Sequence, residues 1–349
     1  MEELGIDALI IGPSPDLVYL SGFGGRQSER LLLFILPRLG TPRLLLPSFE
    51  APRIAALLPD VEMTLWDDGE DPLRDLRALV SRRTSARIGV GAQLFASTIL
   101  ALSDRLDEAQ FVDASTVLAE LRLRKSEAEL ELLRHTATAA DATLSDLFAE
   151  ELAGRAESTL AMLAAQHLLE HGVDDVGHTL VATGANTVVP HHHPSRDRVE
   201  VGATLFDIGG VYGGYRSDVT RTICVGPPDD ELRRVHACVL NASEKAFSRV
   251  RPGVPAAEID AAARQVIEEA GYGANFTHRT GHGIGLDVHE PPYLAAGDTT
   301  PLAPGMVFSI EPGIYLPGRF GVRIEDIVAV TQDGAERLNH VGRELAILR

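Results

Sequence analysis

Two aspartates flank a glycine-rich turn in the stretch LFDIGGVYGGYRSDVTRT, where their carboxylates could share one cation. Asp207 and Asp218 are eleven residues apart. If the segment forms a hairpin, both side chains can point to the same face. Aspartate is also a common turn residue, so the pair taken alone favours a structural role.

Three histidines lie among glycines in the stretch HRTGHGIGLDVHEPP. His278, His282 and His289 fall within twelve residues, with three glycines between them. Glycine lets the backbone come close to a bound group. The segment is not a phosphate-binding loop, because no lysine followed by serine or threonine comes after the glycines. A single histidine is usually structural, whereas three at this spacing indicate a site.

Two glutamates lie within apolar stretches that are predicted to be strands. Glu311 belongs to VFSIEPGIYL and Glu325 to VRIEDIVAV. Burying an ionised carboxylate without a partner is very costly, so each glutamate needs a counter-charge. Arg323 could supply one. Together with Asp207 and Asp218, however, the glutamates carry more negative charge than one arginine balances, and a pair of divalent cations would balance it.

Four carboxylates and one imidazole make an oxygen-rich ligand set. Such a set suits hard or borderline ions, with manganese as the first expectation and cobalt, zinc or iron as alternatives, and it excludes soft thiolate chemistry. Two ions a few ångströms apart can hold a water, lower its pKa towards about 7 and polarise a carbonyl for attack. The sequence therefore predicts metal-assisted hydrolysis.

The triplet in PHHHPS also looks like a metal site. Adjacent side chains of an extended backbone point to opposite faces, so three neighbours cannot all approach one ion. His192 and His193 are therefore predicted to lie at the pocket rim or behind it. The remaining histidines are predicted to be ordinary surface or packing residues: His135, His167, His171, His178, His236 and His340.

Length and charge narrow the class of protein. A chain of 349 residues predicts two domains, and a net charge of −18 opposes binding to nucleic acid. There is no run of eighteen apolar residues, and the acidic start MEELGIDALIIG is unlike a signal peptide, which predicts a cytoplasmic protein with no membrane partner. Cys224 and Cys238 match neither a zinc site nor a redox pair, and are predicted to be buried and reduced.

Residues 1 to about 120 have the pattern of a small α/β domain. Pro37 and Gly40 between two apolar runs predict a hairpin, and therefore a mixed sheet. The strands are predicted at 7–12, 31–36, 43–47, 62–66 and 87–91, and the helices at 48–58, 71–82 and 95–106.

The second part of the chain is predicted to be α+β. A long helix is expected over 115–150, with a capping box of Ser126 and Glu129, and a second helix is expected to end at Gly172. Beyond residue 175, strands alternate with glycine-rich turns around helices at 229–250 and 255–271. A helix pair followed by strands, twice over, weakly indicates an internal duplication.

The five candidate ligands occur in the order Asp207, Asp218, His282, Glu311 and Glu325. This order resembles the ligand set of the pita-bread metallopeptidases, which include methionine aminopeptidase, aminopeptidase P and prolidase (Xaa-Pro dipeptidase). PDLVYLSGF and LRLRKSEAELELLR resemble the amino-terminal domain and linker of the proline-specific branch, while GANTVVPHHHPS and SIEPGIYLPGRFGVRIED resemble its catalytic domain. The resemblance implies a creatinase-like α/β domain over residues 1–120 and an α+β pita-bread catalytic domain over 121–349.

The resemblance also implies roles for individual residues. Asp207 would chelate one metal, while Asp218 and Glu325 would bridge both. His282 and Glu311 would complete the second metal, and Glu311 would also carry a proton for the bridging water.

Four further residues match accessory positions of the same enzymes. His191 matches a histidine that transfers a proton or stabilises the intermediate, and His289 matches one that contacts substrate near the scissile carbonyl. His278 and Arg323 match positions that shape the substrate pocket.

The activity that follows from the resemblance is cleavage of small peptides with proline at the second position, by two metal ions in a homodimer. A dipeptidase is favoured over an aminopeptidase P because the chain is compact. The α/β domain of about 120 residues before the catalytic fold argues against a methionine aminopeptidase. All five ligand positions are intact, which argues against the metal-free enzyme creatinase and against an inactive binding protein of this fold.

Overall fold

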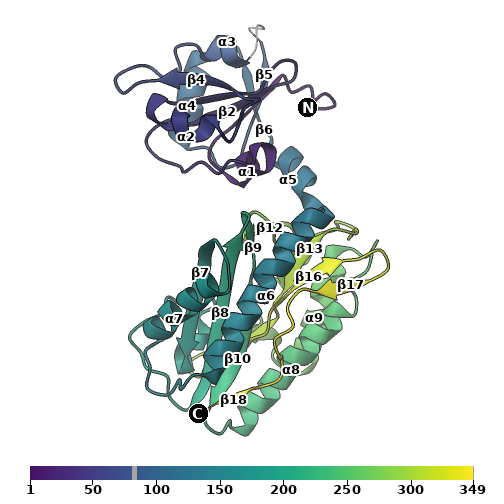
Figure 1. Cartoon of the computed structure of the whole chain (residues 1–349). Coiled ribbons are helices and arrows are strands. Elements are labelled where there is room, and N and C mark those ends of the chain that lie inside the picture. The colour runs from purple at the N-terminus through teal and green to yellow at the C-terminus, as the bar shows by residue number, and fades with distance from the viewer. Residues whose placement is uncertain (81–84, 349) are drawn as a thin grey trace. The chain divides into compact units, whose positions relative to one another are not determined.

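The computed structural model describes residues 1–80 and 85–348. The chain divides into two compact units, Met1–Arg122 and Leu123–Arg349, whose helices and strands are labelled in Figure 1. None of the described helices is long and apolar enough to cross a membrane.

The described residues of the first unit contain a mixed six-stranded sheet. Its strand order is β4-β3-β2-β1-β5-β6. The strands are β1 Ala8–Ile11, β2 Leu33–Pro37, β3 Arg43–Pro47, β4 Glu62–Trp66, β5 Arg87–Val90 and β6 Gln110–Asp113. Strands β2 and β3 pair antiparallel, which confirms the predicted hairpin, whereas β1 and β5 pair parallel.

Helices cover both faces of this sheet because alternate strand residues point to opposite sides. Ala8 and Ile10 pack with helices α3 and α4. Leu9 and Ile11 pack with α1, α2 and α5. These helices are α1 Pro15–Ser21, α2 Ala51–Ala55, α3 Leu76–Val80, α4 Ala96–Arg105 and α5 Ser115–Leu123.

The sequence patterns missed helix α1 and strand β6 of this unit. Helix α1 has seven residues, and β6 offers two apolar residues, so neither shows a clear periodicity. The predicted end of the third helix, at residues 81–82, lies outside the described residues. The predicted α/β class of the unit is confirmed.

Two helix pairs support the second unit. They are α6 Glu127–Ala149 with α7 Glu157–Glu170, and α8 Asp230–Phe247 with α9 Ala256–Glu269. The predicted capping box of Ser126 and Glu129 is present at the start of α6. The helical stretch predicted over 115–150 is therefore two helices, α5 and α6, and the second begins at the predicted N-cap Ser126. Helix α7 has His171 as its C-cap, and Gly172 follows at a φ of 88° rather than being the cap itself.

The strands that the structure describes in the second unit form three sheets. One is β18-β10-β8-β7 with β9 paired to β8, another is β12-β11-β13-β16-β17, and the third is the pair β14-β15. The strands are β7 Asp175–Thr183, β8 Gly202–Tyr212, β9 Tyr215–Arg216, β10 Val219–Val225, β11 Gly281–Gly283, β12 Glu290–Leu294, β13 Val307–Ile310, β14 Gly313–Leu316, β15 Phe320–Arg323, β16 Asp326–Val330, β17 Ala335–Arg337 and β18 Ile347–Leu348.

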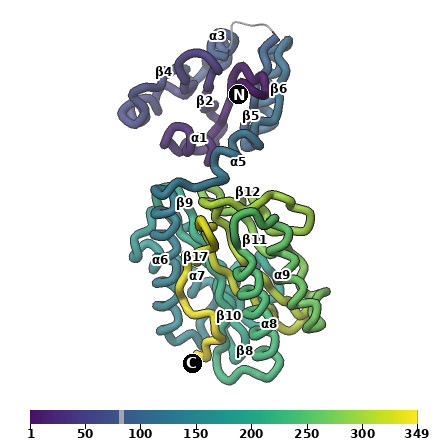
Figure 2. Tube along the Cα trace, turned by 90° about the vertical axis from the view of Figure 1, so that its right-hand side faces the viewer, coloured from purple at the N-terminus to yellow at the C-terminus, as the bar shows by residue number. Residues whose placement is uncertain are grey.

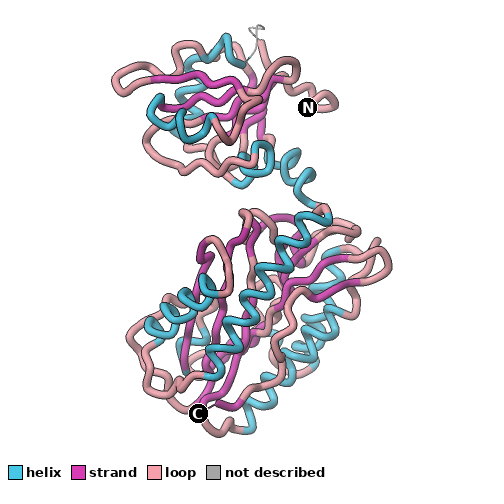
Figure 3. The backbone as a smooth tube through the Cα atoms, viewed as in Figure 1, coloured by secondary structure: helices cyan, strands magenta, loops and turns pink. Residues whose placement is uncertain are grey.

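Each helix pair packs with its own set of strands. Helices α6 and α7 share a core with β7, β8 and β10. Helices α8 and α9 share another with β13, β15 and β16. In Figure 2, α6 and α9 lie on opposite sides of this unit with strands between them, and Figure 3 shows α6 running along the strands.

Candidate metal centre

The alternation of side chains along β8 carries Asp207 to the face away from the helices. Phe206 and Ile208 are fully buried against α6 and α7. Asp207 lies between them in the sequence and therefore points to the opposite face of the sheet. The apolar neighbours thus determine the direction of the acid.

The same alternation places the second pair of acids. Val322 and Ile324 pack with α8 and α9, so Arg323 and Glu325 point the other way. Phe308 and Ile310 pack with the same helices, and Glu311 follows the last residue of β13.

Glu311 and Glu325 stand between strands, which corrects the prediction that they lie within them. Glu311 separates β13 from β14, and Glu325 separates β15 from β16. Strands β13 and β16 belong to one sheet, and β14 and β15 to another. The apolar alternation continues across both breaks, so periodicity alone gave no sign of them.

The predicted site residues converge on one cavity of about 930 Å³. They come from positions spread over more than a hundred residues of the sequence. The cavity is lined by His191, Asp207, Asp218, His278, His282, His289, Glu311, Arg323 and Glu325.

A hydrogen-bonded chain holds two of the carboxylates. Arg323 Nη2 donates to Asp207 Oδ2 at 2.5 Å, and its Nε donates to Thr220 Oγ1 at 3.1 Å. The Thr220 hydroxyl donates to Glu325 Oε2 at 2.7 Å. The other oxygen of Glu325, Oε1, is buried and has no hydrogen-bond partner among the described residues. A buried, unpartnered carboxylate oxygen is costly unless it binds a group from outside the chain.

His282 presents its Nε2 atom to the carboxylates. Its Nδ1 lies 3.2 Å from the carbonyl oxygen of Gly283, which can only accept, so Nδ1 carries the proton. Nε2 lies 3.2 Å from Glu311 Oε1 and 3.9 Å from Asp218 Oδ2. Burial lowers the pKa of His282 to about 3. The imidazole is therefore neutral, and its lone pair faces the site.

Tyr315 joins His278 to Arg323. His278 Nδ1 lies 2.7 Å from the carbonyl oxygen of Arg279 and donates to it. The other ring nitrogen accepts from the Tyr315 hydroxyl at 2.8 Å, and that hydroxyl accepts from Arg323 Nη1 at 3.1 Å. Burial lowers the pKa of His278 to about 4, which keeps the ring neutral. Tyr315 was not among the predicted residues, although a tyrosine in the apolar strand β14 is a weak signal of a polar contact.

The carboxylates repel one another in the absence of other positive charge. Burial, reinforced by the charges of Asp218 and Asp207, raises the pKa of Glu311 to about 8. Burial and neighbouring carboxylates also raise the pKa of Asp218 and of Glu325. Asp207 behaves differently: burial raises its pKa, but Arg323 and His178 together outweigh burial and hold the pKa of Asp207 well below its usual range. These two positive charges are still fewer than the four acids.

The donor set fits divalent cations. Among the described residues, two groups of three side chains have ligand atoms within 4.8 Å of one another: His178, Asp207 and Asp218, and Asp218, His282 and Glu325. Asp218 belongs to both groups, as a carboxylate shared by two ions would. The excess negative charge and the unpartnered Glu325 oxygen agree with this arrangement.

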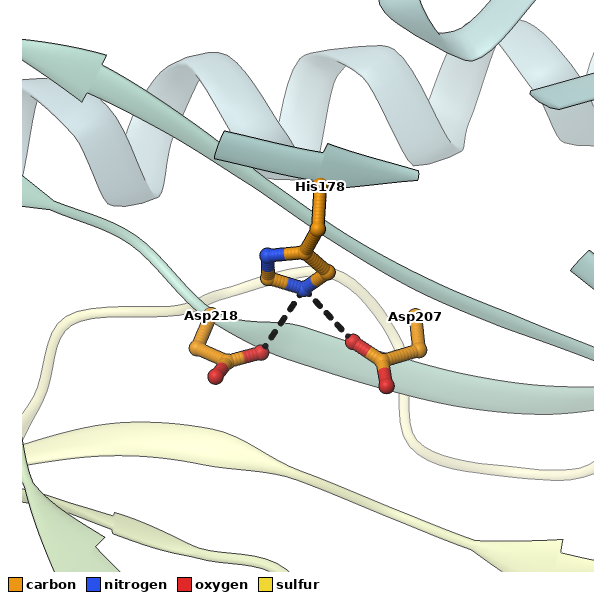
Figure 4. A group of neighbouring side chains, drawn as sticks. All are labelled: His178, Asp207 and Asp218. Carbon is orange, nitrogen blue, oxygen red and sulfur yellow. Dashed lines mark hydrogen bonds and ion pairs between the residues drawn. The ribbon is translucent and has the colours of Figure 1, made fainter. Parts of the chain in front are cut away.

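His178 was predicted to be an ordinary surface or packing residue, and that prediction is wrong. Its Nε2 lies 2.8 Å from Asp207 Oδ1 and 3.2 Å from Asp218 Oδ1 (Figure 4). Burial disfavours the imidazolium, but the negative charges of Asp218 and Asp207 raise the pKa of His178 well above its usual value. No local motif marks this residue, because its partners lie 29 and 40 positions further along the chain.

The histidine triplet is anchored by a buried glutamate that the sequence did not single out. His192 Nε2 lies 2.7 Å from Glu157 Oε2, at the start of α7. Glu157 is completely buried and also accepts hydrogen bonds from the backbone N–H groups of Thr183 and Ser195. His191 and His193 line the cavity and are exposed.

Comparison with known families agrees with this geometry. The model of metallopeptidase family M24 matches residues 131–332, and the Creatinase/Prolidase N-terminal domain matches residues 1–124. The chain belongs to metallopeptidase family M24. The predicted combination of a creatinase-like domain and a pita-bread catalytic domain of the proline-specific branch is confirmed.

M24 relatives resemble the chain over its whole length. The probable dipeptidase PepE of Mycobacterium tuberculosis is 40% identical, covering 99% of this chain and 93% of the relative. The Xaa-Pro dipeptidase of Lactobacillus delbrueckii subsp. lactis is 34% identical, covering 100% and 96%. Among solved structures, prolidase from Thermococcus sibiricus has a TM-score of 0.96 at 36% identity, covering 99% and 96%. X-Pro aminopeptidase from Thermotoga maritima has a TM-score of 0.87 at 30% identity, covering 99% and 97%.

Proposed function

We propose that this metallopeptidase hydrolyses dipeptides with proline at the second position. The observation that carries the proposal is the convergence of four carboxylates and His282 on one cavity. The names of relatives that match the full length of the chain, a prolidase and Xaa-Pro dipeptidases, support proline as the second residue of the substrate.

In this proposal, two divalent cations complete the site. Manganese is the first expectation, and cobalt, zinc or iron are the alternatives. Asp207 would hold one ion, Asp218 and Glu325 both ions, and His282 and Glu311 the other. The bound ions would polarise the scissile carbonyl and lower the pKa of a bound water.

Side chains of the protein would carry out the proton transfers. The leaving nitrogen of proline must gain a proton as the bond breaks. Glu311 would accept a proton from the bound water and pass it to the leaving nitrogen. His191 and His289 both line the cavity, where they would stabilise the tetrahedral intermediate or contact the substrate carbonyl.

His278 and Arg323 would shape the substrate pocket. Arg323 also orients Asp207 directly and Glu325 through Thr220. A lysine could not replace it, because the three N–H donors of an ammonium diverge from a single nitrogen, whereas Arg323 donates from three separate nitrogens.

An aminopeptidase acting on longer peptides is the second candidate. The structural similarity to an X-Pro aminopeptidase favours it. A homodimer in the cytoplasm, with domains over residues 1–120 and 121–349, is part of the same proposal.

Comparing Xaa-Pro dipeptides with tripeptides that begin with the same two residues would test the substrate assignment. The assay would be run with manganese, cobalt and zinc in turn. Faster turnover of the dipeptides is expected, whereas a preference for tripeptides would favour the aminopeptidase. Asp218→Asn should abolish nearly all hydrolysis, because its carboxylate is shared by both candidate ligand groups. Substantial activity in that variant would exclude a bridging role.

A further inference from the structure

His178 occupies a position between two acids that are assigned to metal binding. Its Nε2 is within hydrogen-bonding distance of one oxygen from each, as Figure 4 shows. We propose that His178 is a sixth protein ligand of the metal pair, binding through Nε2 the ion that Asp207 and Asp218 share. This inference rests on the proposed function, because it requires that those acids hold an ion.

The distances are those expected between neighbouring ligands of one ion. Two ligand atoms at a right angle around an ion, each about 2.1 Å from it, lie about 3.0 Å apart. Nε2 of His178 is 2.8 Å from Asp207 Oδ1 and 3.2 Å from Asp218 Oδ1. All three atoms therefore could face one ion without any change of backbone.

A β-bulge in β7 directs His178 towards the acids. Val176 pairs with Gly210 and His178 with Gly209, so Gly177 is the extra residue. The bulge lets Val176 and Val181, an odd number of residues apart, both pack with the helices on one face. His178 then points to the opposite face, where Asp207 also points.

Two glycines leave room for the imidazole and its strand. A Cβ at Gly209 would lie 2.6 Å from His178 Cε1 and 2.0 Å from the carbonyl oxygen of Ser217. A Cβ at Gly177 would lie 2.9 Å from the carbonyl oxygen of Gly209. Both contacts are too close for a side chain, so the backbone around His178 depends on glycine at these positions.

An imidazole ligand would change which metal ions this site prefers. Without His178, the ion next to Asp207 would have only carboxylate ligands from the chain, a set that magnesium and calcium also accept. A nitrogen ligand shifts the preference towards borderline ions such as cobalt, zinc and iron. His178 would therefore make both ions of the pair nitrogen-ligated, one by His178 and the other by His282.

A crystal structure of the full chain loaded with two equivalents of manganese would test the assignment directly. The expected result is His178 Nε2 within about 2.3 Å of the ion that Asp207 binds. If the ions are bound by the other five residues while Nε2 stays beyond about 3 Å, the inference is overturned and the proposed function stands. If neither ion is bound by those five residues, both are overturned.

Calorimetric titration of the metal-free protein with cobalt supplies a second measurement. His178→Ala should weaken binding of one ion by about tenfold or more. The matched control is His193→Ala, which removes another histidine of the same cavity and should leave both affinities within about twofold. Equal cobalt affinities in wild type and His178→Ala would contradict ligation.

Discussion

Glu157 is expected to be the positioning residue for the loop that carries His191. Its buried carboxylate accepts hydrogen bonds from the backbone of Thr183, the side chain of Asn186, and both the backbone and hydroxyl of Ser195, and it contacts His192. These donors lie on β7, in the segment after it and in the histidine loop. Glu157→Ala would leave them without an acceptor.

The expected loss of unfolding free energy follows from the number and the burial of these contacts. A hydrogen bond to a charged group contributes about 1.5–3 kcal/mol, and removing one partner of a buried charged network costs about 3–5 kcal/mol in total because the contacts are not additive. We therefore expect Glu157→Ala to lower the free energy of unfolding by about 4 kcal/mol. Glu157→Gln retains an acceptor oxygen and should lose about half as much.

Urea denaturation followed by far-ultraviolet circular dichroism would measure these losses. Glu170→Ala, an exposed change at the other end of α7, is the control and should cost less than about 0.5 kcal/mol. In the fraction that remains folded, kcat should fall while bound metal is retained, since Glu157 contacts the histidine loop and none of the five proposed ligands. A Glu157→Ala protein within 1 kcal/mol of wild type, or with unchanged kcat, would refute this account of the loop.

Two further predictions concern histidines. His191→Ala should keep its metal while losing about a hundredfold in kcat, the usual contribution of one acid–base group, whereas His193→Ala should be mild. Elemental analysis showing lost metal in the first variant, or equal losses of turnover in both, would contradict the division of the triplet. His236 is buried in α8, and burial lowers its pKa to about 4, so it is neutral when folded. Because its folded pKa is below the unfolded value of about 6.5, its contribution to stability is complete above pH 6.5 and falls by up to about 3 kcal/mol as the pH drops towards 4. Denaturation of wild type and His236→Gln across this range should show a difference that shrinks with falling pH, and a constant difference would rule out a buried neutral imidazole.

Local patterns were sufficient for most helices and strands. The capping box at Ser126 depends on residues three positions apart, and the alternation around Asp207 depends on its two neighbours. Such features depend only on residues that are close together in the sequence, so they can be predicted without the tertiary structure. The excess of acids in apolar segments likewise indicated a cation before the fold was known.

The amino-acid sequence by itself therefore determined the two-domain fold class and, through the apolar neighbours of Asp207, the direction of that carboxylate, and it predicted the candidate metal ligands. Only the tertiary structure decided that Glu311 and Glu325 stand between strands, that Glu157 anchors the histidine loop, and that His178 reaches the acids. The reason is physical: each of these depends on which strands pair and where a bulge shifts their register, and such contacts join residues that no local spacing relates.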